Sequence, residues 1–199
     1  MTRTFRQQID EGILDQAAAL FARRGFAKTS VQDIADTVGL SKAGLLHHWS
    51  SKDALYAAVL SHAESVAGSL LTTVGDAPLG PARDRLVLEA IVDIALAHPG
   101  LVSLMLSPAL AADGEAATAA TEATGAQVFQ AFGIDPGAPA TTRSIRVVGA
   151  LGALAVLALA AHQQDQTIAW RRDSVATCFD ALGHRRAGEG SRSTDQVEA

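Results

Sequence analysis

The sequence predicts an all-α fold, in which an amino-terminal three-helix domain with a helix-turn-helix is joined by a long connector helix to a larger helical domain. Two observations favour this fold class. Apolar residues recur mostly at helical spacing, and alternation with a period of two is scarce in the 199 residues. Proline and glycine interrupt this pattern at helix-like intervals. Because 48% of the residues are hydrophobic and only 5% are aromatic, we expect a mainly aliphatic core.

The first helix is predicted from one apolar stripe near the amino terminus. Arg23, Arg24 and Gly25 follow the stripe, so the last turn has cations that suit the helix dipole, and a glycine that ends the helix. The stripe consists of Ile9, Ile13, Ala17, Leu20 and Phe21.

Residues 30–49, SVQDIADTVGLSKAGLLHHW, predict two short helices joined by a tight turn. Ser30 and Asp33 have the spacing of a capping box, which favours a helix start. Gly39 lies where a helix end requires positive φ, and Ser41 can cap the next helix. This spacing is typical of a helix-turn-helix.

The connector helix begins after Ser50 or Ser51 and is expected to continue to about residue 74, which makes 1–50 the helix-turn-helix domain and 51–183 the larger domain. Breaks at 78–81, 98–100 and 135–137 divide that domain into helices. The apolar run 147–161 is shorter than the roughly 18–20 residues of a membrane span, so we expect a buried helix. The polar tail, 184–199, is expected to be disordered.

The net charge of −5 is unevenly distributed. Residues 1–52 contain seven Lys or Arg against five Asp or Glu, whereas the remainder contains nine against sixteen. All three lysines, Lys28, Lys42 and Lys52, lie in the first part. DNA affinity depends on local cations near the phosphates, so an acidic remainder does not exclude DNA binding.

Several ordered motifs carry a resemblance to a known family. They are FARRGF at the end of the first helix, then TSVQDIA, GLSK and HHWSSKDALY, within about 55 residues. This segment resembles the amino-terminal domain of the TetR family of bacterial transcriptional regulators. The resemblance implies a repressor that binds a palindromic operator in double-stranded DNA as a homodimer and is released by a small-molecule effector.

The residues expected to meet DNA surround the second helix of the motif. Its first residues normally reach base edges, and only Lys42 among them has a long donor, which suits guanine O6 and N7. Ala43 offers a methyl contact and Gly44 permits close approach. Phosphate contacts are implied by the resemblance at Thr29, Ser30, Ser41, His47, His48 and Lys52.

The larger domain is expected to bind the effector and to form the dimer. The apolar composition favours a lipophilic effector. Residues that suit an apolar pocket with a few polar groups are His98, Met105, Phe129, Phe132, His162 and Trp170. In the dimer, the last two helices and their symmetry mates are expected to form a four-helix bundle. Its predicted interface residues are Gly149, Gly152, Val156, Val175, Phe179 and Leu182.

The sequence indicates no catalytic, metal or cofactor site. It contains no HExxH, no glycine-rich phosphate loop and no G-x-S-x-G. The adjacent histidines His47 and His48 would point about 100° apart on a helix. A single cysteine, Cys178, argues against a structural zinc site. The single cysteine and the lack of a secretory signal favour a cytoplasmic protein without a membrane segment. The alternative function is a helical protein-interaction module that does not bind DNA.

Overall fold

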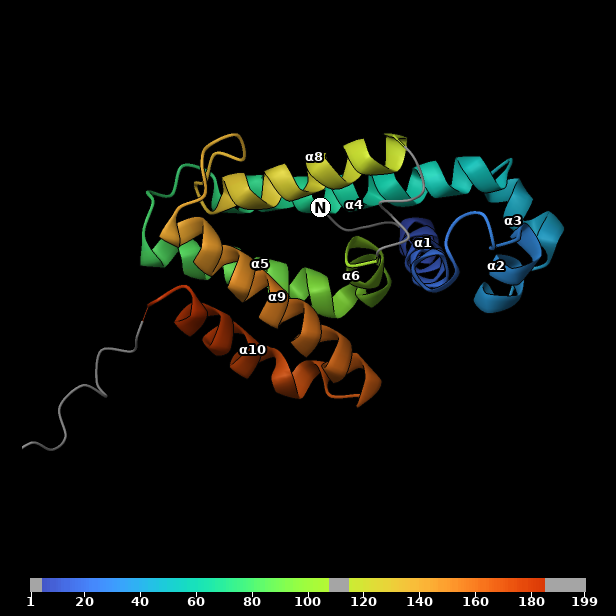
Figure 1. The fold of residues 1–199 in the computed structure, drawn as a ribbon. Helices are drawn as coiled ribbons and strands as arrows, with labels where there is room; N and C mark the ends of the chain where they lie inside the picture. Colours follow the sequence, from blue (N-terminus) through green and yellow to red (C-terminus); the bar gives the residue numbers. More distant parts are fainter. Residues whose placement is uncertain (1–4, 108–114, 185–199) are drawn as a thin grey trace, which may run out of the picture.

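The computed structural model describes residues 5–107 and 115–184, which form helices and no strand (Figure 1). The predicted all-α fold class is therefore confirmed. The predicted disordered tail lies outside the described residues except for His184. The helices are α1 (Phe5–Arg24), α2 (Val31–Val38), α3 (Lys42–His48), α4 (Lys52–Val74), α5 (Pro81–Ala97), α6 (Pro99–Met105), α8 (Glu115–Ala131), α9 (Thr142–Gln163) and α10 (Thr167–Ala181).

The buried apolar residues form two clusters that share the long helix α4. The first cluster joins α1, α2, α3, α6 and the beginning of α8 to the start of α4, around Phe21, Ile34 and Leu45. The second joins α5, α8, α9 and α10 to the end of α4, around Leu88 and Phe132. In Figure 1, α4 extends from the helix-turn-helix to the opposite end of the molecule. A displacement of α4 would therefore change the packing of both clusters.

Helix α6 is fastened to α1 at both of its ends. The backbone N–H groups of Gly100 and Leu101 donate to the carboxylate of Asp15, at 3.1 and 2.9 Å. At the other end, the hydroxyl of Ser107 donates to the carbonyl of Ala22 at 2.9 Å. The Asp15 carboxylate satisfies amide groups that would otherwise lack partners at the start of α6. These bonds attach the larger domain directly to the first helix.

A buried ionic cluster joins the opposite end of the bundle. The carboxylate of Asp84 on α5 is fully buried and accepts two hydrogen bonds from the Arg143 guanidinium, at 3.1 and 2.8 Å. The ring of His184 lies 2.7 Å from the same carboxylate. Burial by itself would raise the pKa of Asp84, but the hydrogen bonds from Arg143 and His184 outweigh it and leave the pKa below its usual value. The cluster connects the starts of α5 and α9 with the end of α10.

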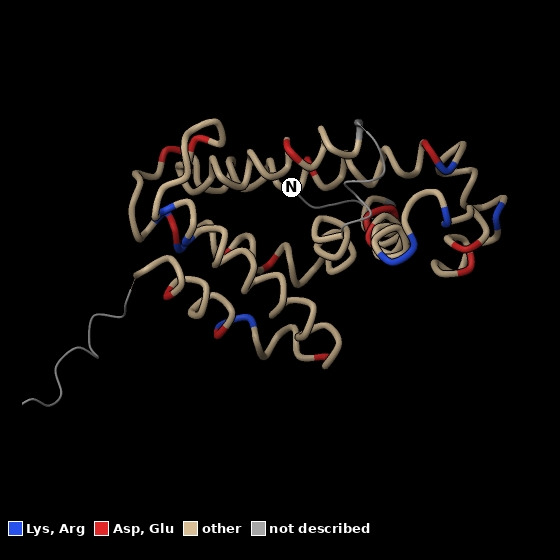
Figure 2. Tube along the Cα trace, viewed as in Figure 1, with Lys and Arg blue, Asp and Glu red and all other residues tan. Residues whose placement is uncertain are grey.

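The predicted buried helix at 147–161 is buried on one face only. Val147, Ala150 and Leu154 of α9 lie in the second cluster, whereas Ile145, Val148 and Val156 are 65%, 57% and 68% exposed. By length and composition alone, α4 and α9 are apolar enough to cross a membrane, and so is the bent pair of α5 and α6 taken together. Along most of α9, Figure 2 shows no charged residue. The run is continuously apolar because both faces of this helix are apolar.

Candidate nucleic-acid interface and apolar cavity

The start of α2 confirms the predicted capping box. The hydroxyl of Ser30 accepts from the backbone N–H of Asp33 at 3.1 Å, and the Asp33 carboxylate accepts from the backbone N–H of Ser30 at 2.9 Å. Arg24 at the end of α1 also lies 2.9 Å from Asp33. The hydrogen bonds from the Ser30 side chain and backbone, together with Arg24, lower the pKa of Asp33. At neutral pH the carboxylate is therefore charged, which suits a helix amino terminus.

The turn between α2 and α3 has the conformation that its residues predict. Gly39 adopts φ 72°, and its backbone N–H donates to the carbonyl of Ala35. The hydroxyl of Ser41 accepts from the backbone N–H of Gly44 at 3.0 Å and so caps α3. Leu45, which is 1% exposed, anchors α3 to the first cluster. The buried Leu45 leaves the first turn of α3 on the surface of the molecule.

Most of the predicted DNA-contacting residues lie on this surface. Lys42 and Ala43 at the start of α3 are exposed, and Gly44 is partly exposed. Ser30, Ser41 and His47 are also exposed, although the two hydroxyls already cap helices. Several of the Lys and Arg segments in Figure 2 lie at this end of the molecule, near the ends of α1 and α3.

The other three predicted contact residues are engaged within the chain. The hydroxyl of the buried Thr29 donates to the carbonyl of Gly25 at 2.8 Å. The ammonium of Lys52 donates to the carbonyl of Phe26 at 2.9 Å and lies 4.1 Å from the centre of its ring. The Nδ1 atom of His48 lies 3.0 Å from the Asp10 carboxylate on α1. In this conformation Thr29 and Lys52 bond to the segment between α1 and α2, and His48 contacts α1 itself.

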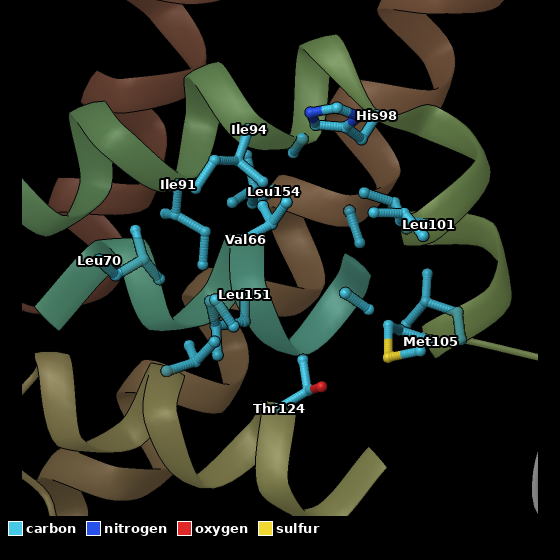
Figure 3. Close-up of a pocket in the computed structure, with 17 residues that line it drawn as sticks. Val66, Leu70, Ile91, Ile94, His98, Leu101, Met105, Thr124, Leu151 and Leu154 are labelled. Carbon is cyan, nitrogen blue, oxygen red and sulfur yellow. The ribbon is translucent and has the colours of Figure 1, made fainter. Parts of the chain in front are cut away.

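A cavity of about 170 Å³ lies between α4, α5, α6, α8 and α9 (Figure 3). Two of the residues predicted to form a pocket, His98 and Met105, line it. The sequence pattern did not indicate the remainder of the wall, because its members, apart from Thr124, are ordinary apolar residues spaced along five helices. They are Ala63, Val66, Ala67, Leu70, Ile91, Ile94, Ala95, Leu101, Val102, Leu106, Thr124, Val128, Leu151, Leu154 and Ala155.

The other predicted pocket residues lie away from this cavity. Phe132 is fully buried in the second cluster. Phe129 lines a different hollow, beside the segment between α8 and α9. His162 is exposed near the end of α9, and Trp170 is partly exposed on α10. In the described part of the chain, no three His, Cys, Asp or Glu side chains are grouped in a way that suits a metal ion.

The predicted dimer residues fall on two different faces. Gly149, Gly152 and Val156 lie on the exposed side of α9. Val175 and Leu182 of α10 are each only 5% exposed and belong to the second cluster. Phe179 is partly buried, with its ring centre 4.7 Å from that of His184. Of the predicted dimer residues, the three on α9 are exposed, Phe179 is partly exposed, and Val175 and Leu182 are buried in the chain's own core.

The helix-turn-helix matches a known family. Residues 13–59 match the sequence pattern described as bacterial regulatory proteins, tetR family. The transcriptional repressor KstR2 of Rhodococcus jostii is 46% identical over 48 residues, which is 24% of each chain. The transcriptional repressor Rv3405c of Mycobacterium tuberculosis is 41% identical over 59 residues, or 30% of this chain and 31% of that protein. The similarity thus spans a quarter to a third of the length of these relatives.

Solved structures share the fold over most of the chain. The TetR family transcriptional regulator PfmR of Thermus thermophilus has a TM-score of 0.55 and 22% identity, and covers 94% of this chain and 100% of its own. A TetR-like transcriptional regulator of a Rhodococcus species has a TM-score of 0.56 and 21% identity, with 95% and 100% covered. The chain therefore carries, at residues 13–59, the sequence pattern of the tetR family of bacterial regulatory proteins, and its fold resembles that of solved TetR-family regulators.

Proposed function

We propose that the protein is a transcriptional repressor that binds a palindromic operator as a homodimer and is released from it by a small-molecule effector. The observation that carries the proposal is the exposed first turn of α3, which is held outward by the Ser41 cap and the buried Leu45. The first turn of a recognition helix is the part that normally meets base edges. A DNA-binding regulator of this kind acts in the cytoplasm.

Within this interface, Lys42 addresses a base and the neighbouring groups address phosphates. The ammonium of Lys42 is exposed on the first turn of α3 and suits the acceptors of a guanine. His47 and the backbone around Ser30 and Ser41 are exposed for phosphate contacts, which position the protein without reading sequence. Lys52 contributes mainly by its bond to Phe26, because its ammonium would have to leave that carbonyl to reach a phosphate.

The exposed side of α9 supports the dimer. A Cβ atom added at Gly149 or Gly152 would meet nothing within 4 Å, so the chain itself does not require glycine there. A glycine in the middle of a helix costs roughly 0.5–1 kcal/mol relative to alanine. In a dimer, glycine at these positions would let α9 of a second copy approach closely, and that contact would cover Val148 and Val156. A twofold dimer can place two recognition helices about 34 Å apart, in successive major grooves.

Helix α6 offers a route from the effector to DNA. Leu101 and Met105 of α6 line the cavity, and the start of the same helix is bonded to Asp15 on α1. A molecule in the cavity that moves α6 therefore moves α1, which packs against α2 and contacts α3 through Asp10 and His48. An effector shifts this equilibrium only as far as its affinity differs between the two arrangements, typically by ~1–3 kcal/mol.

The DNA-binding proposal is tested by selecting a binding sequence from random duplex DNA and titrating it by fluorescence anisotropy. We expect Lys42→Ala to weaken binding to the selected sequence about tenfold, and wild-type affinity to fall steeply with salt. Arg172→Ala is the control, because Arg172 is exposed on α10, far from the motif in Figure 1. A protein-interaction module would select no sequence and show no steep salt dependence.

The dimer proposal is tested by analytical ultracentrifugation. We expect the wild-type chain to sediment as a dimer and Gly152→Asp to sediment as a monomer, because the carboxylate would be buried without a partner. Ala123→Asp, at an exposed position on α8, is the matched control and should remain dimeric. A Gly152→Asp protein that dimerised as strongly as the control would place the interface elsewhere.

A further inference from the structure

The wall of the cavity between α4, α5, α6, α8 and α9 has a uniform chemistry. Apart from His98, Met105 and Thr124, every residue that lines it is Ala, Val, Leu or Ile. No Asp, Glu, Lys or Arg is among the described lining residues. A charged molecule would therefore lose its hydration without gaining an opposite charge, which is costly in an apolar site.

The size of the cavity limits the molecule further. At about 170 Å³ it is comparable with apolar cavities of roughly 150 Å³, which bind benzene and stay free of water. The space therefore suits a molecule of about six to ten non-hydrogen atoms. Leu106 at the end of α6 is 56% exposed and also lines the cavity, so one edge of the wall reaches the surface.

One polar atom in the wall lacks a partner. The hydroxyl oxygen of Thr124 on α8 is buried and has no hydrogen-bond partner among the described residues. Leaving such a group unsatisfied costs about 1–3 kcal/mol. One turn earlier, the hydroxyl of Thr121 donates to the carbonyl of Ala117 at 2.7 Å. Of these two threonines, Thr124 is therefore the one whose hydroxyl can hydrogen-bond to a ligand.

The second polar group, His98, lies across the cavity from Thr124 in Figure 3. Its ring packs edge-on against the ring of His62, with 5.3 Å between their centres, and the residue is only 9% exposed. His98 is therefore held mainly by protein contacts, and its ring forms part of the cavity wall that a ligand would contact.

We propose that this cavity binds an uncharged, mainly hydrocarbon molecule of six to ten non-hydrogen atoms, with one hydroxyl or carbonyl group that hydrogen-bonds to Thr124. A hydroxyl side chain both donates and accepts, so it can pair with either group. That this molecule acts as the effector rests on the proposed function, whereas its binding to the cavity does not.

The test uses the full-length protein without DNA and a series of molecules built on one ring. The probes are cyclohexanol, cyclohexanone, methylcyclohexane, cyclohexanecarboxylate and cyclohexylammonium, with binding followed by ligand-observed NMR at neutral pH. We expect the alcohol and the ketone to bind best, methylcyclohexane more weakly, and the two ions not at all. Ions that bound as well as the alcohol would overturn the proposal.

Two substitutions locate the binding. Thr124→Val removes the hydroxyl at similar volume, and we expect it to lower the affinity for cyclohexanol about fivefold relative to methylcyclohexane. Thr121→Val is the matched control and should leave this ratio unchanged. Ala155→Leu, which fills the cavity, should abolish binding of every neutral ring, and Val128→Phe does the same where Ala155→Leu fails to fold. An unchanged ratio in Thr124→Val, or full binding in a folded cavity-filling variant, would contradict the proposal.

The outcome for the cavity is separate from the outcome for DNA. The best-binding probe is added to the complex of the protein with its selected DNA sequence. Binding to the free protein together with release of DNA supports both proposals. Binding without release leaves the ligand class intact and removes its role as effector. No binding of any neutral probe to the free protein overturns the ligand class, whether or not the protein binds DNA.

Discussion

The contact between α6 and α1 depends on the absence of a side chain at residue 100. A Cβ atom at Gly100 would lie 1.9 Å from the carbonyl oxygen of Asp15 and 2.7 Å from its carbonyl carbon. Both of those atoms belong to the α1 backbone, so no side-chain rotation can relieve the clash. Gly100→Ala therefore forces the start of α6 away from α1.

The size of the effect follows from these distances. Ordinary van der Waals contact of a Cβ atom begins at 3.4 Å, whereas the added Cβ would lie 1.9 Å from the Asp15 carbonyl oxygen. The start of α6 must therefore move about 1.5 Å away from α1. The bonds from Gly100 and Leu101 to the Asp15 carboxylate, now 3.1 and 2.9 Å, would lengthen beyond hydrogen-bonding range. Overpacking and the loss of these two bonds together cost about 2–4 kcal/mol of the free energy of unfolding.

Urea unfolding followed by circular dichroism measures this loss. With a slope of about 2 kcal/mol per M, typical of a domain this size, the midpoint should fall by about 1–2 M. Gly125→Ala is the control: it lies within α8, where an added Cβ meets nothing within 4 Å, and it should stabilise the protein by about 0.5–1 kcal/mol. Equal midpoints for the two variants would refute this account of the contact.

A double mutant checks the proposed cause. In the Gly100→Ala background the bonds to Asp15 are already broken, so Asp15→Ala should cost much less there than in the wild-type protein. Additive effects of the two substitutions would mean that the Asp15 bonds survive the displacement of α6.

Three further predictions concern other parts of the fold. Asp84→Asn should lower the free energy of unfolding by about 3 kcal/mol at neutral pH, because it leaves the Arg143 charge without its partner. The pKa of Asp84 is lowered in the folded state, so the difference in the free energy of unfolding between the wild type and Asp84→Asn should be full above about pH 4 and shrink as the pH falls through the folded pKa. A difference that stayed constant down to pH 3 in urea titrations would contradict this. Gly39→Ala should cost about 1–2 kcal/mol in the same assay, because residue 39 has φ 72° although the space around it is open. Burial raises the pKa of the Cys178 thiol to about 11, so a disulfide reagent at pH 8 should react with it only after unfolding, and rapid reaction with the native protein would show that the thiol is accessible.

The sequence by itself determined the helices and the motif. The Ser30 cap, the Gly39 turn and the Ser41 cap depend on residues within a few positions of one another, so their conformation is a local consequence of residue type. The all-α fold class follows because helical periodicity runs through most of the chain.

Only the tertiary structure decided which side of each helix is covered and what each long side chain contacts. The bond from Lys52 to Phe26 and the contact of the His48 ring with the Asp10 carboxylate join residues that are distant in sequence. The cavity is the space left where five helices meet, and among the described residues that pack around it none gives the Thr124 hydroxyl a hydrogen bond. On α10, the apolar stripe gave no sign that Val175 and Leu182 face the chain's own core. Side-chain periodicity shows that a helix has an apolar face, but the partner of that face is set by how distant elements pack.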